Sequence, residues 1–272
     1  TVTAYGVNKD APIDGGEGTD TLEINAALAY SADTATNEAA GISGFETLYV
    51  NTTLSQDMTP LSDITTLAVG TGDVATLTEV AGLTTVAMYP GAGAGADLTL
   101  ATDGAADSLV VALGSDAVQT ASTTTTLDAV EYETMTVSSA GADGNSITVT
   151  ADALTDLTVV GSKNVTVTLA TDTGTTTLPL TSIDASGATG TVNVQAASAD
   201  SGVTVTPGSD ALTVNLGDGA DTVTGTAKAD NLVTGKGDDT ITGNGGDDTV
   251  NAGEGDDTVT LGDGDNDVTL GK

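Results

Sequence analysis

The chain has 272 residues and carries a net charge of −34, from 39 acidic residues against 5 lysines, with no arginine, histidine or cysteine. This charge repels nucleic acids and anionic lipid surfaces, so neither is expected as a partner. Without cysteine no disulfide or thiolate metal site can form, and no apolar run is long enough to predict a membrane span.

The composition predicts strands joined by tight turns. Large side chains are scarce, with one Phe, five Tyr and no Trp beside 35 Gly. Thr and Val favour strands, whereas Gly, Asp and Asn favour turns. We therefore expect an all-β, elongated fold with a thin core rather than a compact globule.

An N-terminal segment, residues 1–43, contains the turn-rich run GGEGTDTLE at residues 15–23. Asp20 closes its glycine turn, and Leu22 is the first aliphatic residue after it. Two weaker runs of the same type follow: AGAGADLTL at 92–100, with Asp97 in the same position, and TDGAADSLV at 102–110, with Asp107.

The middle segment, residues 44–210, carries a looser repeat. GFETLYV, DITTLAV and GLTTVAM begin at Gly44, Asp63 and Gly82, at a spacing of 19 residues. This spacing predicts one strand per repeat and an irregular parallel β-solenoid with coils of about 19 residues. We interpret Glu46 and Glu133, within FETLYV and YETMTV, as solvent-facing strand residues.

The C-terminal segment, residues 211–272, contains a strict tandem repeat. Six nine-residue units run without gaps from Leu216 to Thr269: LGDGADTVT, GTAKADNLV, TGKGDDTIT, GNGGDDTVN, AGEGDDTVT and LGDGDNDVT. Glycines cluster at the second and fourth positions, Asp occupies the sixth position of the first five units, and the eighth position is always aliphatic. Each unit therefore predicts a six-residue turn and a three-residue strand whose middle residue points inward.

Two such units make one coil of 18 residues. Successive coils stack as parallel strands about 4.8 Å apart, so the sixth-position residues form two columns. One edge carries Asp221, Asp239 and Asp257, and the other carries Asp230, Asp248 and then Asn266.

Stacked carboxylates repel one another. At about 5 Å and an effective dielectric of about 20, each like-charge pair costs on the order of 3 kcal/mol. A divalent cation between coils turns this repulsion into a net attraction. Carboxylate and glycine-turn carbonyl oxygens favour Ca²⁺ over zinc or copper. A solvated turn aspartate is the alternative, but it does not explain the in-phase repetition. The predicted calcium ligands are Asp221, Asp230, Asp239, Asp248, Asp257, Gly217, Gly219, Gly235, Gly237, Gly246, Gly253 and Gly255 in the array, and Asp20, Gly16, Gly18, Asp97 and Asp107 outside it.

The tandem units resemble GGxGxDxUx, the nonapeptide of RTX proteins. This resemblance implies that residues 216–269 fold as a Ca²⁺-binding parallel β-roll. The unit GTAKADNLV departs from the pattern, because Thr226 and Lys228 replace its turn glycines, and Asn266 replaces an acid in the last unit. Both departures fall on the same edge, which we expect to hold metal less tightly.

A further resemblance is to bacterial surface-layer proteins of the RTX type, in which a nonapeptide precedes a strand such as ISGFETLYV. It implies a protein secreted by the type I route to the extracellular face of the cell. There it would assemble with copies of itself into a Ca²⁺-dependent lattice. Attachment to a cell-surface polysaccharide would use a region outside this sequence.

The sequence offers little for catalysis. Without His or Cys it has no Ser–His or Cys–His pair, and adjacent acids such as Asp238 and Asp239 point in different directions along the chain. We therefore expect a non-enzymatic structural protein that forms a surface layer or fibre. Two alternatives stay open: a stalk or binding module of a large RTX adhesin, and an accessory domain of a secreted enzyme. Thr-x-Thr pairs such as Thr204 and Thr206 suggest a minor third alternative: a flat threonine ladder like those of ice-binding solenoids.

Overall fold

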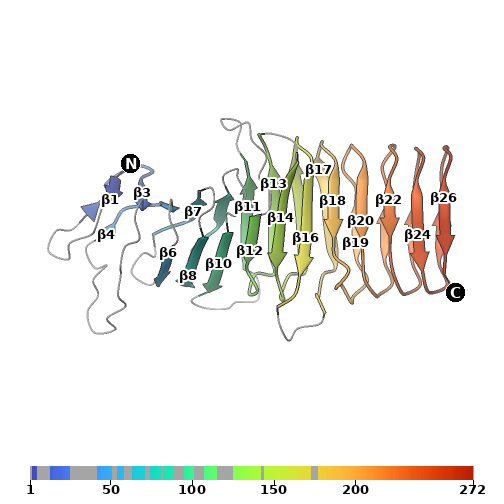
Figure 1. Ribbon diagram of the computed structural model, residues 1–272, viewed down its shortest axis with the longest axis horizontal. Coiled ribbons are helices and arrows are strands. Elements are labelled where there is room, and N and C mark those ends of the chain that lie inside the picture. The colour runs from blue at the N-terminus through green and yellow to red at the C-terminus, as the bar shows by residue number, and fades with distance from the viewer. Residues whose placement is uncertain are drawn as a thin grey trace.

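A computed structural model describes residues 2–4, 13–24, 42–50, 54–57, 63–70, 74–80, 82–88, 95–100, 107–114, 125–141, 144–172 and 177–271. The regular structure in these ranges consists of strands alone. They contain no helix long and apolar enough to cross a membrane. The predicted all-β class is confirmed, and Figure 1 shows the strands stacked as a parallel β-solenoid along the longest axis of the molecule.

From β5 to β26 the chain alternates between two long parallel sheets, so that each coil there gives one strand to each sheet. The 13-stranded sheet contains, in spatial order, β1 (Val2–Ala4), β3 (Thr21–Ile24), β5 (Thr47–Val50), β7 (Thr66–Val69), β9 (Thr85–Met88), β11 (Ser108–Leu113), β13 (Thr134–Ser139), β15 (Asp156–Gly161), β17 (Ser182–Ala188), β19 (Thr204–Thr206), β21 (Thr222–Thr224), β23 (Thr240–Thr242) and β25 (Thr258–Thr260). The 11-stranded sheet contains β6 (Leu54–Asp57), β8 (Val74–Val80), β10 (Gly95–Leu100), β12 (Thr125–Asp128), β14 (Asn145–Thr150), β16 (Val165–Ala170), β18 (Val192–Gln195), β20 (Leu212–Asn215), β22 (Asn231–Val233), β24 (Thr249–Gly253) and β26 (Asp267–Leu270). Strands β2 (Ile13–Asp14) and β4 (Ile42–Ser43) form a separate pair.

Coil length changes along the stack. The predicted 19-residue coil is confirmed from Glu46 to Thr65, which lie at equivalent places in adjacent coils. It is wrong for the middle of the chain, where Glu133 and Thr155 are 22 residues apart and Thr155 and Thr181 are 26 apart. In the C-terminal roll the separation falls to 18 residues, as the nonapeptide period requires.

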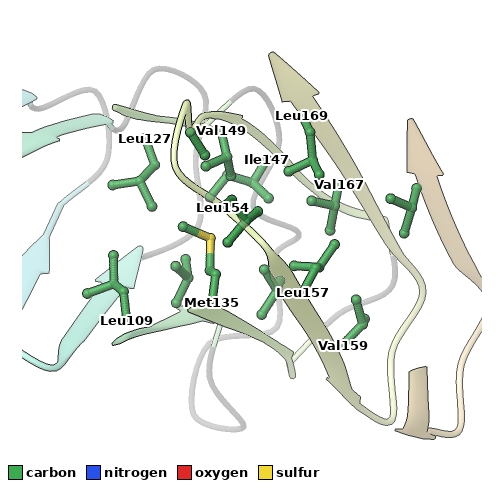
Figure 2. Packing of buried hydrophobic residues seen from close by; sticks show 14 of the residues in the cluster. Leu109, Leu127, Met135, Ile147, Val149, Leu154, Leu157, Val159, Val167 and Leu169 are labelled. Atoms are coloured by element: carbon green, nitrogen blue, oxygen red, sulfur yellow. The ribbon is translucent and has the colours of Figure 1, made fainter. Parts of the chain in front are cut away.

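The core lies between the two sheets and is built from medium-sized aliphatic side chains. Figure 2 shows Met135, Leu157 and Val159 on one side of the core and Ile147 and Val149 on the other. Each is at most 2% exposed, and burying such a side chain contributes about 1.5–3 kcal/mol. The roll continues this core more thinly, with one buried aliphatic residue in each of β21, β22 and β23 and the partly buried Val259 in β25.

The sheets continue across the predicted segment boundaries. Strand β3 pairs with β5 across the boundary at residues 43 and 44, and β18 pairs with β20 across that at 210 and 211. The solenoid and the roll therefore share the same two sheets, while the three-segment division stays a prediction from the sequence.

The nonapeptide phase predicted for residues 92–100 is wrong. Asp97 lies within β10, where it pairs in register with Thr76 and Asp128, rather than in a turn. The apolar alternation of GADLTL favours a strand over the single turn signal before it. Asp107, by contrast, directly precedes β11, as its phase predicts, and the following Leu109 is buried.

Candidate metal centre

Each sixth-position aspartate of the roll lies directly before a strand and reaches back to the preceding coil. On the edge beside the 13-stranded sheet, the amide of Val203 donates to Oδ1 of Asp221 at 2.7 Å. The amide of Asp221 donates to Oδ1 of Asp239 at 2.8 Å, and that of Asp239 to Oδ1 of Asp257 at 3.1 Å. The predicted column of acids is therefore a ladder in which each carboxylate binds the backbone of the coil before it.

The opposite edge, beside the 11-stranded sheet, carries the same ladder. The amide of Leu212 donates to Asp230 at 2.7 Å, and the amide of Asp230 donates to Asp248 at 3.1 Å. Asn266 continues it, since its Oδ1 accepts from the amide of Asp248 at 2.9 Å. An amide oxygen can thus replace the carboxylate in the backbone contact.

The second carboxylate oxygen identifies the metal centre. Oδ2 of Asp221, Asp239 and Asp248 is buried and has no hydrogen-bond partner among the described residues, and each of these residues is 1% exposed. A buried charged oxygen without a partner is costly. A cation between the coils would satisfy it, so these residues fit a bound Ca²⁺.

Burial also changes the acidity of these groups. Desolvation raises the pKa of Asp221 to about 7, against the opposing hydrogen bond from the Val203 amide and with the help of the nearby Asp239 charge. Desolvation likewise raises the pKa of Asp248. Without metal, the folded roll therefore disfavours the ionised forms of Asp221 and Asp248.

Besides water, the remaining ligands would come from the turn backbone. No group of three or more acidic side chains converges on one point in the described ranges, whereas Ca²⁺ takes six to eight oxygens. The glycine turns stack closely enough to supply carbonyls: the amide of Gly219 donates to the Lys236 carbonyl at 2.7 Å, and that of Gly237 to the Glu254 carbonyl at 2.8 Å.

Glycine is required at these turns for two reasons. Gly237 has a φ of 133°, which side chains rarely adopt, and a Cβ there would collide with the carbonyl oxygen of Gly219. Gly217 lacks a positive φ, but a Cβ there would collide with the carbonyl oxygen of Ala199. The other predicted glycines, Gly16, Gly18, Gly219, Gly235, Gly246, Gly253 and Gly255, all have positive φ.

Two residues of this kind were not predicted from the sequence. Glu46 and Glu133 directly precede β5 and β13, and their Oε2 atoms accept the amides of Asp20 and Asp107, each at 2.7 Å across 26 residues. They therefore hold the place that the next sixth-position aspartate holds in the roll, and the interpretation as solvent-facing strand residues is wrong. The shared Glu-Thr after an aromatic residue, in FET and YET, was the available signal.

The fold and these turns define a class: parallel β-solenoids whose stacked turns bind cations. Within the chain, residues 215–250 and 242–272 match the family model of the RTX calcium-binding nonapeptide repeat, with four copies. These repeats bind Ca²⁺, so the C-terminal segment is an RTX β-roll with calcium as its cofactor. Comparisons with curated proteins and with solved structures give no match.

Proposed function

We propose that this chain is a non-enzymatic, extracellular structural protein whose calcium-loaded solenoid assembles into a surface layer or fibre. The observation that carries the proposal is the set of partnerless carboxylate oxygens on Asp221, Asp239 and Asp248. Calcium is plentiful outside cells and scarce inside them. A roll that needs the ion would stay loose during synthesis and fold after secretion.

The uncharged face of the roll supports assembly with copies of the same chain. Strands β19, β21, β23 and β25 read TVT, TVT, TIT and TVT, with no charged residue. Thr204, Thr222, Thr240 and Thr258 form one exposed column in register, and the half-buried Thr224 and Thr242 with the exposed Thr260 form a second column. We name these seven residues the threonine face.

Charge explains why a second copy is the fitting occupant of this face. The chain carries a net charge of −34, and the turns beside the threonine face carry exposed acids such as Asp238, Asp256 and Glu254. Two copies would repel through those turns, whereas their threonine faces can meet without opposing like charges. The paired faces could then exchange Thr–Thr hydrogen bonds. An ice surface or a glycan on this face would instead support the binding-module alternatives.

Two experiments test the proposal. Circular dichroism of the full chain should lose strand signal in excess EGTA and regain it in millimolar Ca²⁺, and an unchanged spectrum in EGTA would contradict the calcium requirement. Electron microscopy after calcium addition should show sheets or fibres. Strictly monomeric particles that bind a glycan would favour the adhesin module instead.

A further inference from the structure

Thr226 closes the turn before Asp230, whose two carboxylate oxygens both accept hydrogen bonds. Its amide donates to Oδ2 of Asp230 at 2.6 Å, and its hydroxyl lies 2.9 Å from Oδ1. Oδ1 also accepts the amide of Leu212. Both oxygens of Asp230 are therefore bound within the protein, whereas Oδ2 of Asp221, Asp239 and Asp248 has no partner among the described residues.

The backbone of this turn differs as well. The amide of Lys228 donates to the Thr226 hydroxyl at 3.0 Å, so the hydroxyl accepts one hydrogen bond and donates another. Lys228 is not among the residues with positive φ, although the glycines at its position in neighbouring units, such as Gly219 and Gly237, are. The turn is thus closed by its own hydrogen bonds, and Thr226 is only 6% exposed.

Asn266 closes a second turn in a similar way. Its Oδ1 binds the amide of Asp248, while its Nδ2 lies 3.4 Å from the carbonyl oxygens of Gly262 and Gly264 in its own turn. An N–H donor therefore points at turn carbonyls of the kind that would otherwise face a cation.

We propose that Thr226 and Asn266 take the place of calcium at their turns, so that the edge beside the 11-stranded sheet keeps an unsatisfied carboxylate only at Asp248. The inference rests on the calcium-bound roll described above and deepens it. The edge of Asp221 and Asp239 depends on metal at each turn, whereas the opposite edge is held at Asp230 and Asn266 by hydrogen bonds alone. The two edges of the roll then differ in metal content.

Restoring the repeat tests the proposal. The double variant Thr226→Gly/Lys228→Gly turns GTAKADNLV into GGAGADNLV. It removes the hydroxyl that binds Asp230 and the Lys228 amide, and it restores both turn glycines, so that the turn can adopt the conformation of its neighbours. We expect native mass spectrometry of the full chain in Ca²⁺ to count one more bound ion than in the parent chain. The matched control Ala227→Gly/Ala229→Gly changes the same turn but keeps Thr226, and should bind the parental number.

A second variant provides an independent test in case the first does not fold. Asn266→Asp restores the missing acid in a mostly exposed turn and should also add one ion. If both variants keep their strand signal in calcium and bind the same number of ions as the parent, the proposal is overturned. If the parent itself binds no calcium, the proposed function fails instead, so the two failures are distinguishable.

Discussion

Asp239 accepts the backbone amide of Asp221 from the preceding coil with one carboxylate oxygen, at 2.8 Å, while its other oxygen is buried with no partner among the described residues. The first contact sets the register of adjacent coils. The second oxygen carries the charge that a cation must satisfy. One side chain therefore supplies both a structural contact and an oxygen that fits a bound cation, and substitution can separate the two.

Asp239→Asn keeps the acceptor for the Asp221 amide and removes the buried charge. We expect the metal-free chain to become more stable and the affinity for Ca²⁺ to fall by about tenfold or more, since a hydrogen bond or contact to a charged group is worth about 1.5–3 kcal/mol. Isothermal titration calorimetry and urea unfolding in EGTA measure the two effects. Asp256→Asn, at an exposed position in the next coil, is the control and should change neither.

The pH dependence of the roll follows from Asp221, whose pKa burial raises from 3.8 to about 7. A raised carboxyl pKa means that the folded state holds its proton longer than the unfolded state. Without calcium, stability should therefore be greatest in acid and fall as the pH rises from about 4 through 7. Urea unfolding in EGTA across this range measures the trend.

Calcium binding should show the opposite trend, because the ion requires the deprotonated carboxylate. Affinity is expected to rise between pH 5 and 8. In Asp221→Asn, which cannot titrate at this position, both pH trends should be flatter. If stability and Ca²⁺ affinity depend on pH equally in the parent and in Asp221→Asn, the role given to Asp221 is contradicted.

Glu133 should stabilise the middle of the solenoid through the amide of Asp107. Glu133→Ala removes the acceptor and is expected to lower the free energy of unfolding by about 1–2 kcal/mol. Glu133→Gln keeps an oxygen at the same place and should cost much less. Urea unfolding in saturating calcium compares them, and equal losses in both variants would show that charge, rather than the hydrogen bond, matters.

The thin core of the roll still contributes to its stability. Ile241 is 0% exposed and pairs in register with Val223 and Val259. Ile241→Ala should destabilise the calcium-loaded chain by about 2–5 kcal/mol. Val268→Ala, at 38% exposure, is the matched control and should cost well under half as much. Equal destabilisation by Ile241→Ala and Val268→Ala would contradict the placement of Ile241 in the core.

The threonine face should govern assembly. Thr222→Lys/Thr240→Lys introduces charge at its centre and is expected to abolish calcium-induced assembly in analytical ultracentrifugation, while leaving the circular dichroism unchanged. Asn231→Lys/Thr249→Lys places the same charges on the 11-stranded sheet of the same coils, at exposed positions. Loss of assembly in this control, but not in Thr222→Lys/Thr240→Lys, would show that copies contact one another through the 11-stranded sheet instead.

The nonapeptide phase alone predicts the register of the roll. Because its period is strict, the pairings of Val223 with Ile241 and of Leu232 with Val250 follow directly from the sequence. The middle of the solenoid was less predictable, since turns of unequal length stretch its coils to 22 and 26 residues. A fixed period cannot locate such strands, and it placed Asp97 in a turn instead of in β10.

The candidate metal centre, like the fold, was predictable from the sequence only in part. The acid columns were predictable because each aspartate repeats in phase, and the weaker edge followed from Thr226, Lys228 and Asn266 interrupting the pattern. The hydrogen bonds by which Thr226 satisfies Asp230 depend on turn geometry, which the sequence pattern does not specify. Glu46 and Glu133 were missed because a different acid and a 26-residue coil hide their equivalence to the roll.

Diffraction at a wavelength that gives anomalous signal from calcium, on crystals of the full chain grown in Ca²⁺, tests the central claim most directly. The account predicts ions between successive coils, at about 2.3–2.6 Å from Oδ2 of Asp221, Asp239 and Asp248. Anomalous peaks absent from these turns, with the three oxygens bound to water or to protein donors instead, would contradict it.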